Sequence, residues 1–424
     1  MVKLVSTILI LFFLSFWFSG TKAADEVVGV VDLHAHIASH LPYGFMLFGG
    51  TPTDQPPKEF SYKHNHQQQM YVEWVRSSGI KIFVQAALVN IFGFTKDIAK
   101  RQIKEQLAYV ENLVKDHADI FALARTPQEA RVAIAKGKTV FVHALEGAEY
   151  LVDSKEEAET LYQQGVVMVG PIHLVDNEYG DASILKGFKK LLNWKGLITR
   201  GIVSSPGDGL TEKGKKAIEY LIEAGILVDM AHMSEVSTNQ VLEISSHYFA
   251  PVIMSHGMLR GIRQEERGLT DVQLKAIYKN AGLIGLTGGL DYLNPSSDKI
   301  ENKEVTLPAD YCQHSIDDFN FHYDYFNKLF ANEKYAVAWG SDANGFVSHY
   351  RPKYGEEGNG MAAPVGSSNP YNVRGMESLA YFPNFLKALT EMGKDTKALE
   401  SSAEAFLRSW ERALKIREGI KRQK

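Results

Sequence analysis

Five apolar runs in this sequence each end in a histidine, a glutamate or an aspartate. The runs lie near residues 27–33, 139–145, 226–231, 251–255 and 335–341, and the polar residues that follow them are His34, His36, Glu146, His232, His256 and Asp342. Continuous apolar runs are typical of parallel strands that are buried on both faces. The carboxyl ends of such strands in a barrel form one rim, so we expect these side chains to meet there.

The spacing of His34 and His36 is typical of a metal site. Side chains at i and i+2 of a strand leave the same face, so both rings can reach one ion. Taken alone, such a pair more often consists of structural or solvent-facing histidines than of ligands. Imidazole and carboxylate groups at four further strand ends favour ligands for a borderline ion such as Zn²⁺.

Apolar runs and helical patterns alternate along the chain, which predicts the α/β class. The eight expected strands lie near residues 27–33, 80–88, 139–145, 166–172, 226–231, 251–255, 282–287 and 335–341. Helical periodicity appears between them, as in residues 211–223 and 235–245. This order predicts a (β/α)₈ TIM-type barrel, and a chain of 424 residues can form one such domain over residues 24–424.

Three long inserts rich in Gly, Pro, Asn or Ser follow expected strands, at residues 44–62, 290–308 and 345–371. Because each follows a strand, we expect these loops over the C-terminal mouth of the barrel. Residues 376–417 are expected to form two helices packed outside the barrel.

Residues 1–23 resemble a secretory signal peptide. Lys3 precedes an uncharged stretch from residue 4 to 20, and Thr21 and Ala23 offer the small residues that signal peptidase reads. We therefore expect an exported protein, periplasmic or secreted, with no stable membrane anchor after cleavage. The alternative is an uncleaved anchor, although the apolar span is short for a bilayer.

Charge and cysteine content exclude several classes. The net charge of −4 gives no reason to expect a nucleic-acid partner. Cys312 is the single cysteine, so the chain cannot form an internal disulfide or a thiolate cluster for a metal.

Several sequence blocks together resemble the membrane (renal) dipeptidase family, peptidase family M19 of the amidohydrolase superfamily. The most specific blocks are residues 209–214, 224–234 and 251–256, and further similarity covers Leu145-Glu146-Gly147, Ile172-His173 with Asn177, and residues 340–345. The resemblance implies a zinc-dependent dipeptidase with two Zn²⁺ ions per chain, although other divalent metals would also suit these ligands. The resemblance is also compatible with a homodimer.

The resemblance also implies a role for each site residue. Glu146 would bridge the two ions, His34 and His36 would hold one, and His232 and His256 the other. Asp342 would lie at the metals as the base that moves a proton from water to the leaving nitrogen. His173 would stabilise the oxyanion, and Arg267 would grip the carboxylate of a dipeptide substrate.

Two positions depart from the pattern of the family. His36 stands where the family usually has aspartate, and Asn344 stands where a second aspartate often follows Asp342. A neutral ligand at position 36 leaves the ion pair about one charge more positive. An amidohydrolase for another small amide or lactone therefore remains an alternative, as does a solute-binding barrel without catalysis.

Other polar residues have simpler interpretations. His64 and His66 lie in a polar segment and are expected at the surface, and His143 has the opposite strand parity to Glu146, which predicts a packing role. Asp32 and Asp229 are candidates for supporting a ligand histidine. Without the family, His173 would be interpreted as a buried core histidine and Arg267 as a surface charge.

Overall fold

The computed structural model describes residues 26–43, 53–56, 69–89, 95–184, 193, 207–366 and 368–423. The expected signal peptide at residues 1–23, His64 and His66, and most of the 44–62 insert lie outside the described residues. No helix within the described ranges is both long and apolar enough to cross a membrane.

Eight parallel strands close into a barrel, so the predicted fold class is confirmed. The strands of the sheet are β1 (Val31–Ala35), β2 (Ile82–Leu88), β3 (Phe121–Leu123), β4 (Thr139–Glu146), β5 (Val166–Gly170), β6 (Leu227–Asp229), β7 (Val252–Gly257), β8 (Leu283–Thr287) and β9 (Ala338–Gly340). Their order is β2-β1-β9-β8-β7-β6-β5-β4, and β2 pairs with β4 to complete the ring. Nearly every strand residue is buried, as continuous apolar runs predict.

All eight predicted strands are present, and β3 is an additional one. β3 pairs only with the first residues of β4, from Thr139 to Phe141, whereas β5 pairs with β4 from His143 onward. With three residues, of which only Phe121 is fully buried, β3 has no continuous apolar run that the sequence could show.

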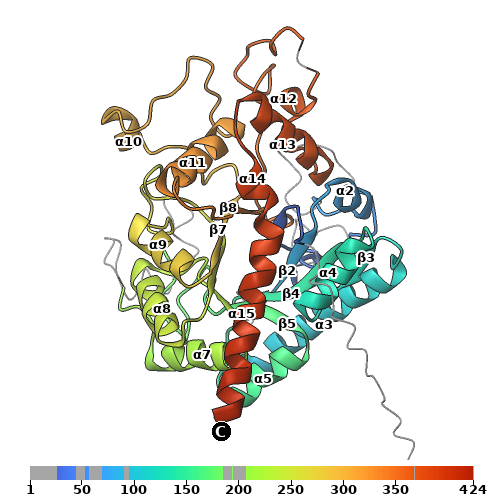
Figure 1. Cartoon of the computed structure of the whole chain (residues 1–424), viewed down its shortest axis with the longest axis vertical. Coiled ribbons are helices and arrows are strands. Elements are labelled where there is room, and N and C mark those ends of the chain that lie inside the picture. Colours follow the sequence, from blue (N-terminus) through green and yellow to red (C-terminus); the bar gives the residue numbers. More distant parts are fainter. Residues whose placement is uncertain are drawn as a thin grey trace, which may run out of the picture.

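Helices connect the strands and cover the barrel (Figure 1). They are α1 (His40–Tyr43), α2 (Val72–Ser77), α3 (Lys96–Asp116), α4 (Pro127–Ala135), α5 (Lys155–Gln163), α7 (Glu212–Glu223), α8 (Glu235–Tyr248), α9 (Asp271–Lys279), α10 (Ser297–Glu301), α11 (Ile316–Leu329), α12 (Tyr371–Arg374), the 3₁₀ turn η2 (Leu379–Tyr381), α13 (Phe382–Glu391), α14 (Lys397–Glu400) and α15 (Ser402–Gln423). The predicted helices at 211–223 and 235–245 correspond to α7 and α8. The hydroxyls of Thr211 and Ser234 accept backbone N–H groups and start these two helices.

The C-terminal helix α15 closes the amino-terminal end of the barrel. It contacts β1, β6 and β8, and Figure 1 shows it crossing in front of the strands. Its side chains also bond the turns that lead into three strands. Ser409 donates to the carbonyl of Ala281 before β8, Arg412 to that of Phe249 before β7, and Arg417 to that of Ala224 before β6. The carboxyl-terminal end of the barrel is therefore the end that remains open for a functional site.

Loops after β1, β8 and β9 meet at the carboxyl end. The N–H of Leu290 donates to the carbonyl of Ser348, and His314 Nδ1 contacts the carbonyl of Leu290. Gln69, after β1, exchanges hydrogen bonds with Asn344, after β9. The 290–308 and 345–371 inserts therefore start at the carboxyl end of the barrel, where the sequence placed them.

Candidate metal centre

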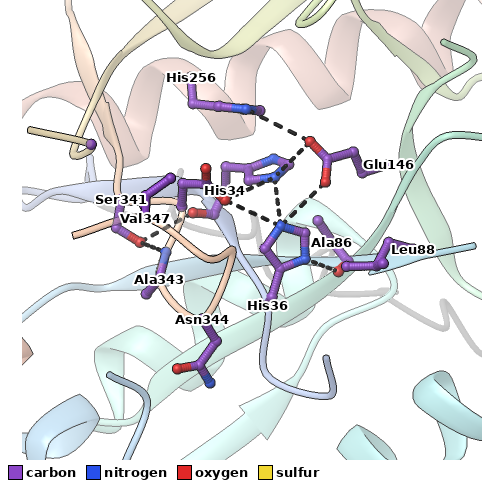
Figure 2. A network of polar contacts seen from close by, with 12 residues as sticks. His34, His36, Ala86, Leu88, Glu146, His256, Ser341, Ala343, Asn344 and Val347 are labelled. Atoms are coloured by element: carbon purple, nitrogen blue, oxygen red, sulfur yellow. Dashed lines mark hydrogen bonds and ion pairs between the residues drawn. The ribbon is translucent and has the colours of Figure 1, made fainter. Parts of the chain in front are cut away.

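The six predicted ligands converge at the carboxyl end of the barrel, around the carboxylate of Glu146. Figure 2 shows His34, His36 and His256 beside this carboxylate. The six residues come from strand ends on β1, β4, β6, β7 and β9, which lie far apart in sequence. Each of them is buried, and so is His173. Their ligand atoms form three groups, each with all its atoms within 4.8 Å of one another: His34, His36 and Asp342; His34, Glu146 and His256; and Glu146, His173 and His232.

The β1 histidines lie between the two carboxylates. His34 Nε2 is 3.3 Å from Glu146 Oε1, and His36 Nε2 is 3.2 Å from Glu146 Oε2. His36 Nε2 is also 3.3 Å from Asp342 Oδ1, and the two Nε2 atoms are 3.1 Å apart. Both oxygens of Glu146 therefore face imidazole nitrogens.

His232 and His256 approach the same glutamate from β6 and β7. Their Nε2 atoms lie 3.0 Å and 3.6 Å from Glu146 Oε1, and 2.9 Å from each other. Burial lowers the pKa of both histidines well below the usual range, and the positive charge of Arg267 lowers both further. Both rings are therefore neutral, which is the form that can bind a cation.

The carboxylates produce a field that favours positive charge. Burial alone would raise the pKa of Glu146, but the charges of His173 and His34 and hydrogen bonds from His232 and His34 hold it well below its usual range. Burial lowers the pKa of His36, but Asp342 and Glu146 outweigh this and raise it to about 10. The buried negative charge thus stabilises any cation placed among these rings.

This donor set fits a binuclear metal group. Imidazole nitrogens and carboxylate oxygens are the ligands of zinc and similar ions, and the pairs of facing Nε2 atoms need a positive charge between them. His36 is turned toward the centre because its Nδ1 lies 2.9 Å from the carbonyl oxygen of Ala86. Such a partner on the far nitrogen fixes the orientation of a ligating ring.

Two of the predicted ligands stand on left-handed backbone. His232 has φ +68° and Asp342 has φ +54°, and this conformation costs a non-glycine residue about 1–2 kcal/mol. Hydrogen bonds hold both turns: the N–H of Asp342 donates to the carbonyl of His34, and the N–H of Ser183 donates to that of His232. Such strain is characteristic of functional sites, where the surrounding structure fixes the side chain.

Asp32 and Asp229 support the backbone of the ligands, not their rings. Asp32 Oδ1 accepts the N–H groups of His34 and Ser341, and Asp229 Oδ1 accepts those of Ala231 and Ser255. Burial raises the pKa of Asp32 to about 7 and also raises that of Asp229. Each aspartate therefore ties two neighbouring strand ends together below the centre.

His173 and Asp342 are the most exposed members of the cluster, at 9% and 8%, so they face the mouth. His173 Nε2 lies 3.4 Å from Glu146 Oε2, and burial lowers its pKa. The position of both groups suits contact with an entering substrate.

Arg267 is buried beside His232, and is therefore not a surface charge. Its Nη2 is 3.1 Å from His232 Nε2, and its guanidinium lies 5.1 Å from the centre of the Tyr292 ring. Its Nε has no hydrogen-bond partner, and no ion pair joins it to a carboxylate of the described residues. Its Nη2 also contacts the carbonyl of His256 at 3.4 Å, whereas Arg263 of the same loop pairs with Glu265.

Two supporting features escaped sequence reasoning. Gln69 and Asn344 pair through Gln69 N–H to Asn344 Oδ1 at 2.7 Å and Asn344 N–H to Gln69 Oε1 at 2.6 Å, which fixes the loop that carries Asp342. Ser255 contacts two ligand histidines. The Asn344 departure from the family pattern was visible in the sequence, but its partner lies 275 residues away.

His143 lies outside the cluster, in the buried packing position that its strand parity predicts. Its Nδ1 is 3.2 Å from Gln85 Oε1 on the neighbouring strand β2, and it is fully buried. Burial, together with the charge of Arg125, lowers its pKa to about 3.

Comparisons with known proteins agree with this geometry. The family profile described as "Membrane dipeptidase (Peptidase family M19)" matches residues 22–424. Dipeptidase ataJ of Aspergillus terreus is 25% identical over 204 residues, which are 47% of this chain and 48% of that protein. Dipeptidase verJ of Clonostachys rogersoniana is 25% identical over 214 residues, 50% of this chain and 49% of that protein. The matched region thus spans about half the length of these relatives.

Solved structures share the fold over nearly the whole chain. A metallo peptidase from Rhodobacter sphaeroides, liganded with a phosphinate mimic of the dipeptide L-Ala-D-Ala, has a TM-score of 0.63 and 17% identity, covering 92% of this chain and 100% of its own. The probable dipeptidase PvdM from Pseudomonas aeruginosa has a TM-score of 0.62 and 18% identity, covering 92% and 96%.

We expect His143→Leu to change acid stability and leave metal binding intact. A pKa of about 3 in the folded state lies below the unfolded value near 6.5, so the unfolded chain binds the extra proton as pH falls through this range. Because of His143, the free energy of unfolding of the native protein should fall by about 1.4 kcal/mol for each pH unit below 6.5. The His143→Leu variant should lose this contribution to the pH dependence. Urea unfolding between pH 6.5 and 4.5 measures it.

The exposed His247→Leu is the matched control and should leave the slope unchanged. Loss of metal from the His143→Leu variant, measured by elemental analysis, would place His143 in the metal site and contradict the packing role.

Proposed function

The chain belongs to the membrane dipeptidase family, peptidase family M19, and from this membership we propose that it is a binuclear, zinc-dependent dipeptidase. The observation that carries the proposal is the meeting of five strand ends around the Glu146 carboxylate, where imidazole rings and two carboxylates face one another. His34, His36 and Asp342 would hold one ion, and His232 and His256 the other, with Glu146 between them.

Two bound cations would lower the pKa of an attacking water and polarise the scissile carbonyl. Asp342 is the group we assign as general base, because it lies at the mouth beside His36 and can carry a proton toward the leaving nitrogen. His173, on the opposite side of Glu146, is assigned to the oxyanion that develops on the carbonyl oxygen.

Arg267 supports the choice of a dipeptide as substrate. A buried guanidinium without a carboxylate partner among the described residues is costly unless an anion binds it. Its Nη2 lies 3.1 Å from His232 Nε2, so an anion bound to Arg267 would lie beside the proposed metal ligands. We assign Arg267 to the terminal carboxylate of a dipeptide.

We also propose that the protein is exported and acts in the periplasm or outside the cell. The support is the composition of residues 1–23, with a basic start, an uncharged apolar stretch and small residues before a cleavage site after Ala23.

The proposed function predicts a strict metal dependence. The protein should contain close to two divalent ions per chain, and removal of these ions with a chelator should abolish hydrolysis of a dipeptide panel. Added Zn²⁺ should restore the activity, because the bound ions would lower the pKa of the attacking water. Elemental analysis and a ninhydrin assay for released amino acids measure the two quantities. Full activity in exhaustively stripped protein would rule out a metallohydrolase.

Substrate class can be tested through Arg267. Arg267→Met should lower kcat/KM for free dipeptides by about 2–5 kcal/mol in transition-state free energy, because a desolvated charge pair is lost. Dipeptides amidated at the C-terminus should be poor substrates of the native protein, and the substitution should add little further loss.

Arg260→Met is the matched control, since Arg260 lies in the same loop and pairs with Glu235. It should reduce turnover of both substrates alike. If the native protein cleaves amidated and free dipeptides equally well, a hydrolase of another small amide or a lactone replaces the dipeptidase proposal.

A further inference from the structure

The adjacent residues Ser255 and His256 both face the candidate metal centre. Adjacent residues of a regular strand point to opposite faces. The pairing of β7 with β8 is irregular between Met254 and Gly257, and a bulge of this kind re-aims a side chain. The hydroxyl of Ser255 is thereby brought, fully buried, beneath the rings of two candidate ligands.

The hydroxyl contacts one histidine from each half of the centre. Ser255 Oγ lies 3.2 Å from His34 Nδ1 and 2.9 Å from His256 Nδ1. The two rings are stacked with centroids 3.9 Å apart and an interplanar angle of 33°. The backbone N–H of Ser255 also donates to Asp229 Oδ1 at 2.9 Å.

The hydrogen-bonding capacity of a serine determines the direction of these contacts. A hydroxyl has one hydrogen to donate and two lone pairs to accept with, whereas a carboxylate only accepts. The two lone pairs of the Ser255 hydroxyl can therefore accept an Nδ1–H from His34 and one from His256 at the same time, whereas its single hydrogen could serve only one of the two rings. With the proton of both histidines on Nδ1, the lone pair of each Nε2 would be free for a cation beside Glu146, whose Oε1 lies 3.3 Å and 3.6 Å away.

We propose that Ser255 is a positioning residue that holds His34 and His256 in the tautomer that binds metal and so couples the two ion positions. The proposal rests on the binuclear function proposed above. Loss of the hydrogen-bond partner on the nitrogen that does not bind the metal typically lowers the metal affinity of a site by about 10–100-fold. His36 has its own partner in the carbonyl of Ala86, whereas one serine serves both His34 and His256.

Ser255→Ala tests the proposal. Titration of the stripped protein with Co²⁺, followed by its visible absorption, should show both dissociation constants raised by about 10–100-fold. Ser255→Thr keeps the hydroxyl and should restore both constants to near the native values. Ser409→Ala removes a buried serine hydroxyl that bonds only backbone carbonyls of Ala281 and Ala405 on the far side of the barrel, and should leave both constants unchanged.

The outcomes separate this inference from the proposed function. If the native protein binds two ions and Ser255→Ala binds both with unchanged affinity, or loses affinity at one position only, the coupling role is wrong and the proposed function stands. If the native protein binds no ions, the proposed function fails and the inference fails with it.

A measurement on the native protein covers the case in which Ser255→Ala does not fold. Two-bond ¹H–¹⁵N spectra of the metal-free, ¹⁵N-histidine-labelled protein distinguish the two ring tautomers before any ion imposes one of them. Signals of His34 and His256, assigned by omission in single histidine variants, should both show the proton on Nδ1. A bare Nδ1 in either ring would overturn the proposal.

Discussion

The buried carboxylate of Glu146 is the interaction on which the rest of the site depends. A charge removed from water must be paired or must coordinate a cation. Here the nearest groups are imidazole nitrogens from several different strands, the closest at 3.0 Å. The left-handed residues after β6 and β9, the aspartates below the rim and the bulge in β7 all serve to bring those nitrogens to one carboxylate. The barrel supplies the rigid frame that makes this convergence stable.

His36 distinguishes this centre from the usual pattern of the membrane dipeptidase family, which has an aspartate at that position. The histidine is a genuine member of the cluster, since its Nε2 lies within 3.3 Å of both carboxylates. A neutral ligand removes one negative charge, so the two ions would be stronger Lewis acids with less charge compensation. We expect this difference to affect mainly which metal ions and which substrates the protein prefers.

Much of the fold, and the meeting of the candidate ligands at one rim, could be predicted from the sequence, because both follow from a simple physical rule. Strands that are buried on both faces read as apolar runs, and their carboxyl ends meet at one rim. The rule fails where the backbone is irregular or the partner is distant in sequence. Strict alternation would turn Ser255 away from the site, and only the bulge brings it in. The burial of Arg267 depends on Tyr292, which belongs to the next strand's loop. The closure of the barrel by α15 depends on contacts with turns before three separate strands.

The central claim is that Glu146 holds two ions at once, and the metal content of Glu146→Gln tests it most directly. The amide keeps the shape of the side chain and one oxygen but removes the charge that both ions share. With native secondary structure verified by circular dichroism, elemental analysis should show both ions lost together. A variant that keeps one ion at full occupancy, or both, would contradict the bridge.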